Sequence, residues 1–466
     1  MSANIFTVKR SKIEGRLDPI YYIRKNELVG YKHLKLEKIG KHFFVKDGDH
    51  DKLPDDAVSD ENNGFRYLRA QDLKENKIIS EKPIYVTKKY FESVRRCHIY
   101  PNDLLFSIMA SVGATAVVPK NFSICTANRA VGILRAKDEA VFLPEYVQVV
   151  LNTELGIKLL ELQKRGGIQQ RLNLDDISNL ELPVFDFEKQ RKIIDFYNSA
   201  LSQKEQKQEQ SKELLDSIDS YLLSELGISL PQKDNSLSKR IFTTKFSEVT
   251  GGRWDAYYNN QYYKNLFEEF KKSEYKLVFF HEIINDIKNG VEIRNYVDNG
   301  IRYLRVSDLS ENGILNTNAR YVETQKIPER IKLNSNSFLI SRSGSLGLVN
   351  VVTDEVKESI LSSHIFKVDL NTEKVFPEFL ETFFRSSVGQ FQFFRNNNGG
   401  VIPEINHEAL TSLRIILPPL PKQKEIAEHI RGIRAQAKQL QTEAEQILQD
   451  AKHQVEKMIL GEQIWF

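Results

Sequence analysis

Hydrophobic and polar positions follow the same scheme twice along the chain. In the first half, short apolar runs separated by polar or Gly/Pro segments predict strands at 77–79, 84–86, 104–106 and 116–118. From Pro144 the apolar spacing becomes helical, which predicts a helix before the loop at Gly166 and Gly167. The second half repeats this helical stretch with Phe379, Phe383, Phe384, Phe391 and Phe394, which we interpret as core residues rather than nucleic-acid stackers.

Two long polar stretches, 189–227 and 422–460, follow these mixed regions and contain almost no Gly or Pro. Each would be roughly 58 Å long as a helix, at 1.5 Å per residue. Their apolar residues form one stripe among Lys, Glu and Gln, so each helix needs a partner along its length. We predict that the two helices form an antiparallel coiled-coil spacer. The alternative is that each packs only on its own globular part.

The sequence itself is repeated as well as the pattern. Residues 64–78, GFRYLRAQDLKENKI, return at 300–314 as GIRYLRVSDLSENGI, with ten identities at an offset of 236. A period this long indicates two whole domains rather than a solenoid. The predicted fold class is therefore α+β, with two duplicated mixed α/β domains, two long helices and a pseudo-two-fold arrangement. The predicted boundaries are 1–185 for the first domain, 186–228 for its helix, 229–240 for a linker, 241–417 for the second domain and 418–466 for its helix.

Composition narrows the functional classes. A formal charge of +3 in 466 residues permits nucleic-acid binding but does not argue for it. Two cysteines, Cys97 and Cys125, cannot make a disulfide framework and show no metal-ligand spacing, so no metal site is predicted. The N-terminus lacks the apolar core of a signal peptide, and no apolar run is long enough to cross a bilayer. We expect a cytoplasmic protein.

Motifs for catalysis are missing from the sequence. Ser345 in Ser-Gly-Ser-Leu-Gly resembles a nucleophile elbow, but the Gly two residues upstream is absent and no His recurs in both halves. Neither a phosphate-binding Gly-x-x-x-x-Gly-Lys-Ser/Thr loop nor a Gly-x-Gly-x-x-Gly fingerprint is present. The Asn-Pro-Pro-aromatic motif of adenine methyltransferases is also absent. We predict a non-catalytic chain.

Several features together resemble the specificity subunit of type I restriction-modification systems. They are Tyr-Leu-Arg-x-x-Asp-Leu in each half, Ser-x-Gly after a strand, the Gly-Gly loop, and an apolar-Pro segment leading into Lys-Gln and a long helix. The resemblance covers essentially the whole chain and rests on the doubled order of these motifs. The junction is close to the family pattern at Leu417–Pro421 and looser at Leu182–Phe187.

The resemblance implies that each domain is a target recognition domain reading one half of a bipartite double-stranded DNA site. It further implies that the chain directs two methyltransferase subunits and the endonuclease subunits of a type I complex. S-adenosylmethionine, ATP and Mg would then lie on those partner subunits, and no cofactor is expected in this chain. The alternatives are the specificity subunit of a type IIB enzyme and a duplicated protein-binding scaffold without DNA binding.

Two groups of residues are candidates for DNA contact. Arg66, Arg69, Arg302 and Arg305 have the chemistry to bind phosphates or guanine edges. Because they are the same in both halves, we favour a framework role that includes an internal Arg–Asp pair. The loops where the halves differ are better candidates, because small residues admit a phosphate to backbone N–H groups, although tight turns explain them equally. The loop candidates are Ser107, Ser111, Gly113, Gly166, Gly167, Gln169, Gln170, Arg171, Ser341, Arg342, Ser343, Ser345, Gly347, Asn397, Gly399 and Gly400.

Candidates for partner contact lie on the long helices. Leu214, Ile218, Ile433 and Leu440 belong to the apolar stripes. They are predicted to pack either against each other or against methyltransferase helices, and the sequence leaves both possibilities open.

Overall fold

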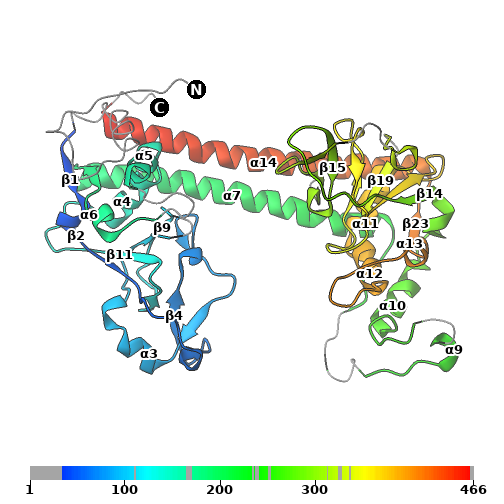
Figure 1. Ribbon diagram of the computed structural model, residues 1–466, viewed down its shortest axis with the longest axis horizontal. Helices are drawn as coiled ribbons and strands as arrows, with labels where there is room; N and C mark the ends of the chain where they lie inside the picture. The colour runs from blue at the N-terminus through cyan, green and yellow to red at the C-terminus, as the bar shows by residue number, and fades with distance from the viewer. Residues whose placement is uncertain are drawn as a thin grey trace. The chain divides into compact units, whose positions relative to one another are not determined.

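A computed structural model describes residues 34–109, 112–163, 171–232, 236, 241–249, 253–311, 313–323, 328–334 and 337–461. The chain divides into two compact units, Met1–Gln208 with Gln441–Phe466, and Glu209–Leu440. Each unit contains one mixed α/β domain together with part of each of two long helices, α7 (Phe187–Glu225) and α14 (Leu420–Leu460). Figure 1 shows the elements of each domain. The prediction of two duplicated α/β domains and a long helix pair is confirmed.

The first domain is built on a four-stranded antiparallel sheet in the order β2-β11-β8-β9. Its strands are β2 (Phe43–Asp47), β11 (Val131–Ala136), β8 (Leu104–Ser107) and β9 (Thr115–Val117). A second sheet has the order β10-β4-β7-β3, formed by β10 (Thr126–Ala127), β4 (Phe65–Leu68), β7 (Ile84–Val86) and β3 (Val58–Ser59). Two small sheets pair β1 (Leu36–Lys38) with β12 (Glu181–Pro183) and β5 (Leu73–Lys74) with β6 (Lys77–Ile78).

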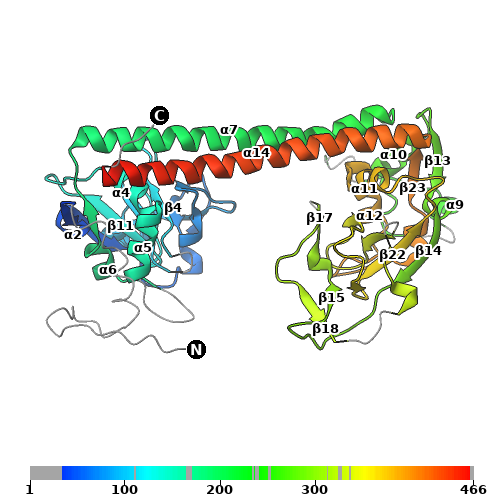
Figure 2. The same cartoon turned by 90° about the horizontal axis from the view of Figure 1, so that it is seen from above.

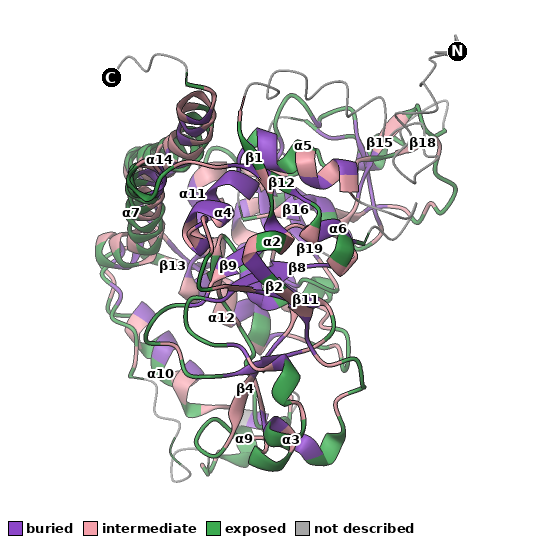
Figure 3. Ribbon diagram, turned by 90° about the vertical axis from the view of Figure 1, so that its left-hand side faces the viewer, coloured by how far each residue is buried: buried purple, intermediate pink, exposed green. Residues whose placement is uncertain are grey.

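Helices of the first domain flank these sheets and connect their strands. They are α2 (Ile39–His42), α3 (Lys88–Ser93), α4 (Pro144–Leu151), α5 (Glu154–Gln163) and α6 (Leu174–Ser178), with the short 3₁₀ helices η3 (Asp55–Ala57), η4 (Ala70–Asp72) and η5 (Arg95–Cys97). Helix α3 is mostly exposed, whereas β8, β11 and α4 are largely buried (Figure 3).

The second domain repeats the strand order of the first. Its main sheet has the order β14-β22-β19-β20, with β14 (Ile284–Asn289), β22 (Ile365–Leu370), β19 (Ser337–Ser341) and β20 (Val349–Val351). The second sheet is β18-β15-β21, formed by β18 (Arg320–Val322), β15 (Ile301–Leu304) and β21 (Ile360–Leu361). The two small sheets recur as β13 (Lys276–Phe279) with β23 (Arg414–Leu417) and β16 (Leu309–Ser310) with β17 (Gly313–Ile314).

Helices of the second domain also match, with some additions. They are α9 (Phe246–Val249), α10 (Gln261–Phe270), α11 (Pro377–Arg385), α12 (Ser387–Arg395) and α13 (His407–Thr411), with η6 (Phe280–Ile283), η7 (Val306–Asp308) and η8 (Glu329–Ile331). The segment between β2 and β4 forms η3 and β3 in the first domain. At the same edge, the described residues of the second domain form an isolated bridge between Val297 and Tyr321.

The prediction of one helix from Pro144 was wrong in one respect, because this stretch forms two helices. The chain turns between α4 and α5, and a Cβ on Gly156 would lie 2.1 Å from the Val150 carbonyl oxygen. Gly389 makes the same approach to the Phe383 carbonyl oxygen, at 2.3 Å, between α11 and α12. Only a residue without a side chain fits at these positions, so both domains contain a helical hairpin where periodicity alone suggests continuity.

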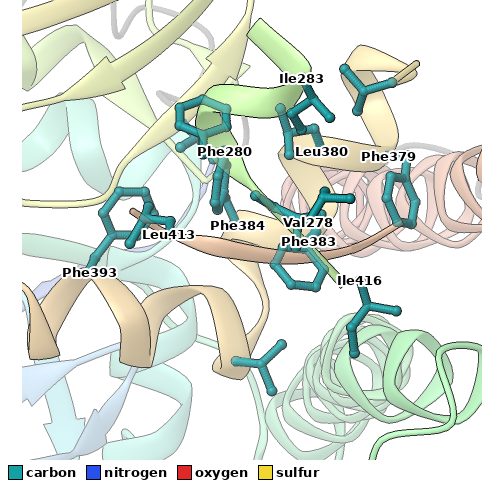
Figure 4. Packing of buried hydrophobic residues seen from close by; sticks show 14 of the residues in the cluster. Val278, Phe280, Ile283, Phe379, Leu380, Phe383, Phe384, Phe393, Leu413 and Ile416 are labelled. Atoms are coloured by element: carbon teal, nitrogen blue, oxygen red, sulfur yellow. The ribbon is translucent and has the colours of Figure 1, made fainter. Parts of the chain in front are cut away.

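The phenylalanines of the second domain build its core, as predicted, with one exception. Phe379, Phe383 and Phe384 are fully buried and converge with Phe280 and Phe393 from neighbouring elements (Figure 4). Their rings contact edge to face, for example Phe280 and Phe384 with centroids 5.2 Å apart. Phe394 is the exception, because it is 46% exposed.

The long helices pair in antiparallel fashion (Figures 1 and 2). Lys207 contacts Glu443 at 2.5 Å, the Ser211 hydroxyl donates to the Ala437 carbonyl at 3.0 Å, and Lys422 contacts Glu225 at 2.6 Å. The buried seam of α14 recurs every seven residues, at Ile430, Ala437, Ala444 and Ala451. Small side chains in a heptad let two helices approach closely, and the large residues Ile433, Leu440 and Ile447 are only half-buried beside this seam.

Both cysteines are free thiols in the interior of the first domain. Burial raises the pKa of the Cys125 thiol to about 12 and also raises the pKa of Cys97. In the part of the chain that the structure describes, every helix is too short or too polar to span a lipid bilayer.

Candidate nucleic-acid interface

The repeated RYLR motif ends a strand in each domain and places its second arginine against an aspartate. The Arg69 backbone N–H donates to Asp72 Oδ2 at 2.8 Å, and the Arg69 Nη2 donates to Asp72 Oδ1 at 3.3 Å. Arg305 and Asp308 repeat both contacts, each at 2.8 Å. Hydrogen bonding to Asp308 raises the pKa of Arg305. Both aspartates are buried, so each pair closes the turn between strand and 3₁₀ helix.

The first arginine of each motif also has partners inside its domain. Arg66 Nη1 donates to the Tyr85 hydroxyl at 3.3 Å, and Arg302 donates to the Asn316 side chain and the Leu315 carbonyl, both at 2.5 Å. In both arginines the Nε atom is buried and makes no hydrogen bond to the described residues. These four arginines therefore sit as the framework interpretation expects, and their contact with DNA stays a prediction.

The end of the repeated motif connects the first domain to α7. Glu75 and Asn76 form the turn between β5 and β6, with φ of 50° and 64°. The Asn76 amide donates to the Tyr197 hydroxyl at 2.9 Å, and the Lys204 ammonium lies 3.3 Å from Glu75. The motif thus has a structural task, which is to fix the sheet to the helix.

The loop after β8 and the loop after β19 are closed by the same backbone bond: the Gly113 N–H donates to the Ser107 carbonyl at 2.9 Å, and the Gly347 N–H donates to the Ser341 carbonyl at 3.4 Å. Ser107 and Ser341 are both fully buried, but their hydroxyls differ in partner, because Ser107 donates to the Met109 carbonyl at 2.9 Å and Ser341 to the Ser345 carbonyl at 2.5 Å. Gly113 and Gly347 follow with φ of 102° and 82°, a region that favours glycine. The structure therefore places these four candidates as turn-forming residues, while Ser345 is exposed at the tip.

The residues next to these serines are held by identical backbone bonds in the two domains. The Ile108 N–H donates to the Ala130 carbonyl at 3.0 Å, and the Arg342 N–H donates to the His364 carbonyl at 2.8 Å. The Leu172 N–H donates to Ile108 at 3.1 Å, as the Ile405 N–H does to Arg342 at 3.0 Å. One position further, Met109 bridges to Arg171 and Ser343 to Glu404. The backbone frame is the same, and the side chains on it differ.

In the second domain these positions form a polar cluster. Arg342 Nη2 lies 2.5 Å from Glu404 Oε1, and Ser343 Oγ lies 2.6 Å from His364 Nδ1. Beside them, His407 Nε2 lies 3.1 Å from Asn289 Oδ1. Partial burial lowers the pKa of His407, and the nearby cations Arg342 and Lys288 lower it further. In the first domain the corresponding positions hold Ile108, Met109, Ala130 and the exposed Arg171.

The loop between Asn397 and Glu404 borders this cluster and is tightly built. The Asn397 side-chain oxygen accepts from the Gly399 N–H at 2.9 Å and from the Glu404 N–H at 2.8 Å. A Cβ on Gly399 would lie 1.9 Å from the Ile402 carbonyl oxygen, whereas Gly400 lies in open space. This arrangement leaves Val401 fully exposed and Ile402 64% exposed at the tip. Asn397 and Gly399 shape the loop, and its apolar tip is the part that faces outward.

The remaining candidates fall into two groups. Ser111, Gly166, Gly167, Gln169 and Gln170 lie outside the described residues. The partner candidates Leu214, Ile218, Ile433 and Leu440 are each half-buried on the helix pair, so part of every side chain stays exposed.

Several residues of the polar cluster were missed from the sequence. Glu404, His364 and His407 were not among the candidates. A comparison of the two halves could have indicated two of them, because the residue type differs at equivalent positions. Glu404 corresponds to Arg171, and His364 corresponds to Ala130. Among the described residues, no group of three or more His, Cys, Asp or Glu side chains is arranged to hold a metal ion.

These features define a class of protein in which one α/β frame occurs twice and carries different side chains at equivalent loop positions. The chain belongs to the family of type I restriction modification DNA specificity domains, whose model matches residues 43–216 and 272–449.

The fold is also similar to that of a solved structure. One chain, from work described as "Structural basis underlying complex assembly and conformational transition of the type I R-M system", aligns over 92% of this chain and 98% of its own at 15% identity, with a TM-score of 0.53. The type I S subunit from M. genitalium aligns at 13% identity over 93% and 98%, with a TM-score of 0.41. The HsdS subunit from Thermoanaerobacter tengcongensis aligns at 15% identity over 93% and 98%, with a TM-score of 0.38. The fold comparison rests on the first of these.

Proposed function

We propose that this chain is the subunit that recognises a bipartite double-stranded DNA target and directs the methyltransferase and endonuclease subunits of a type I restriction-modification complex. Each domain would bind one half of the target. Membership of the specificity-domain family supports DNA sequence recognition in general. The division into two half-sites is proposed from the duplication of the domain.

One observation carries this proposal. The backbone bonds of Ile108 and Arg342 are the same in the two domains, whereas the side chains that these frames present differ. A shared frame positions two domains on DNA in the same manner, because phosphate contacts and docking do not depend on sequence. Different side chains at equivalent places then give each domain its own base preference. A bipartite and asymmetric target follows.

The helix pair would set the separation of the half-sites and bind partner subunits. Antiparallel pairing of α7 and α14 along their lengths favours a stiff spacer over a flexible linker. The half-buried side chains of Leu214, Ile218, Ile433 and Leu440 would provide apolar contacts for two methyltransferase subunits. We propose that S-adenosylmethionine, ATP and Mg act on the partner subunits.

Methylome sequencing tests the proposal directly. A host carrying the partner subunits should show one bipartite methylated motif with this chain and should lose it without the chain. Exchanging residues 1–185 for those of another family member should change one half of the motif and leave the other half unaltered. A change in both halves would contradict the assignment of one domain to each half-site.

Binding measurements give a second and independent readout. Affinity of the purified methyltransferase complex for random duplex DNA should fall steeply as salt is raised, because phosphate contacts release counterions. Absence of binding at low salt, with the methyltransferase present, would count against any role in DNA recognition.

A further inference from the structure

We propose that Arg342 and Glu404 together read one C·G base pair in the half-site bound by the second domain. The Arg342 guanidinium would donate to guanine O6 and N7, and the Glu404 carboxylate would accept from the cytosine N4 amine. This inference rests on the proposed function and adds to it a pair of specificity-determining residues and the base pair that they recognise.

The two side chains are accessible, although their backbones are fixed. The Arg342 side chain is 32% exposed and that of Glu404 is 41% exposed. The Arg342 N–H and C=O are bonded to His364 and Ile405, and the Glu404 N–H and C=O are bonded to Asn397 and Asn398. A rigid backbone under an exposed side chain lowers the conformational entropy lost on binding, which is the arrangement that recognition requires.

The chemistry of the pair matches one base pair in particular. In the major groove, guanine presents two acceptors, and cytosine next to it presents one donor. A guanidinium and a carboxylate side by side present donors and acceptors in the complementary order. At a T·A pair in the same orientation, the carboxylate would face the thymine O4 acceptor and the arginine would meet the adenine N6 donor. The T·A pair therefore sets an acceptor against an acceptor and a donor against a donor, which is costly.

Charged groups of both signs surround the pair. Lys288 lies near His407 and is paired with Asp286 at 3.1 Å, as Arg342 is paired with Glu404. The Arg342 guanidinium also lies over the Phe366 ring, with its carbon 5.9 Å from the centroid, which supports the side chain from below. The equivalent site of the first domain has Ile108 in place of Arg342 and Arg171 in place of Glu404, so it lacks the carboxylate. The C·G reading is therefore specific to the second domain.

A plain structural role is the competing explanation, because the ion pair also links strand β19 to the loop that ends at Glu404. Two kinds of variant separate the roles. R342Q and E404Q each remove one charge. R342E/E404R reverses the pair and keeps the link between strand and loop. R431Q and E378Q break another Arg–Glu pair of the same compact unit, between α14 and α11 at 3.6 Å, in which Glu378 is 40% exposed, and they serve as matched controls.

The experiment has two stages. Methylome sequencing of hosts with the wild-type chain, and with a chimera carrying residues 241–417 of another family member, identifies the half-site read by the second domain. Purified complexes are then titrated with duplexes in which each C·G pair of that half-site is replaced by T·A. For the wild-type complex we expect about a 5- to 150-fold loss of affinity at one C·G pair, the range of a good bidentate contact.

Each variant then has a defined outcome. R342Q and E404Q should bring the discrimination at that pair close to one while leaving the other half-site unchanged, and R342E/E404R should lose the preference for C·G in favour of G·C. The controls should keep wild-type discrimination. If the half-site contains no C·G pair, or if the charge-reversed variant still prefers C·G, the inference is wrong and the proposed function stands. If the wild-type chain confers no motif, the proposed function itself fails.

Discussion

Arg305 and Asp308 form an ion pair whose carboxylate is buried and accepts hydrogen bonds from both the backbone and the guanidinium of the same arginine. Arg69 and Asp72 form the same pair in the first domain. An exposed arginine with a free guanidinium would be a natural DNA contact. Here each guanidinium is bonded within its own turn, which supports a framework role for the most visible repeat in the sequence.

Neutralising Asp308 should therefore destabilise the second domain. D308N removes the charge that faces the Arg305 guanidinium and weakens the cap on its N–H, and we expect a loss of about 2 kcal/mol in the free energy of unfolding, below the full cost of a deeply buried pair because Arg305 is partly exposed. D354N is the control, since Asp354 pairs with Lys357 at 3.3 Å while remaining 88% exposed. Denaturant unfolding that shows equal losses for both variants would contradict the framework role.

A larger side chain in the contact between the two long helices should destabilise the protein at Ala437 and have little effect at Ala435. Ala437 is buried where the Ser211 hydroxyl reaches its carbonyl, whereas Ala435 is exposed two residues earlier. A437L should lower the free energy of unfolding by about 1–3 kcal/mol, because the added atoms force the helices apart. A435L should change it by less than about 0.5 kcal/mol. Thermal unfolding of both variants measures the difference. If A437L is as stable as A435L, the helices do not pack closely through their alanines.

The buried thiol of Cys125 predicts a dependence of stability on alkaline pH. Burial raises its pKa from 9 to about 12, so the folded domain keeps the proton that the unfolded chain releases. The stability that the protonated thiol contributes is fully present below pH 9 and is lost as pH rises from 9 to 12. At pH 10 the free energy of unfolding should have fallen by about 1 kcal/mol from this cause. C125A should show a shallower decline of stability between pH 8 and 10 than the wild-type chain. Parallel declines would contradict the shift.

Alkylation provides a second measurement on the same thiol. Iodoacetamide at pH 8 should modify native Cys125 only as fast as the domain opens, because the thiolate is the reactive form and is almost absent. Fast modification of the native protein would show that the thiol is accessible.

Replacing the apolar side chains of Val401 and Ile402 with serine should weaken DNA binding and leave the free energy of unfolding almost unchanged. Val401 and Ile402 lose little burial in the V401S/I402S variant, so the free energy of unfolding should change by less than about 0.5 kcal/mol. If the tip contacts thymine methyl groups, affinity for the cognate target should fall several-fold while binding to random DNA stays the same. I157S, at an exposed isoleucine of α5, is the control substitution. Equal affinity of wild type and V401S/I402S for the target would exclude the tip from recognition.

Periodicity and repetition in the sequence were enough to predict the architecture. The doubled strand pattern, the aromatic core around Phe383 and the two long helices are all present in the structure. These features depend on apolar burial, which leaves a regular trace in the sequence. The turn at Gly156 escaped prediction because one missing side chain, and no change of period, allows the second helix to cross the first.

The helix seam and the polar cluster were harder to predict for different reasons. Large residues such as Ile433 and Leu440 suggested the contact stripe, whereas the structure buries Ala437 and Ala444 between the helices. Alanine contributes little to an apolar stripe in sequence, although its small volume decides how closely helices pack. Arg342 and Glu404 have 61 residues between them in sequence and are brought together by the bridge of Ser343 with Glu404 and the bond from the Ile405 N–H to the Arg342 carbonyl, so their pairing is a property of the fold.

The antiparallel helix pair has a consequence for the order in which the protein can be completed. The core of the first domain includes Val455 and Ile459 beside Ile193 and Tyr197, so its last apolar residues are synthesised at the far end of the chain. A ribosome adding 5–20 residues per second needs roughly 10 to 50 s to travel from Gln208 to Val455. The second unit, Glu209–Leu440, is contiguous and emerges whole in that interval. The domain that is translated first should therefore be finished last.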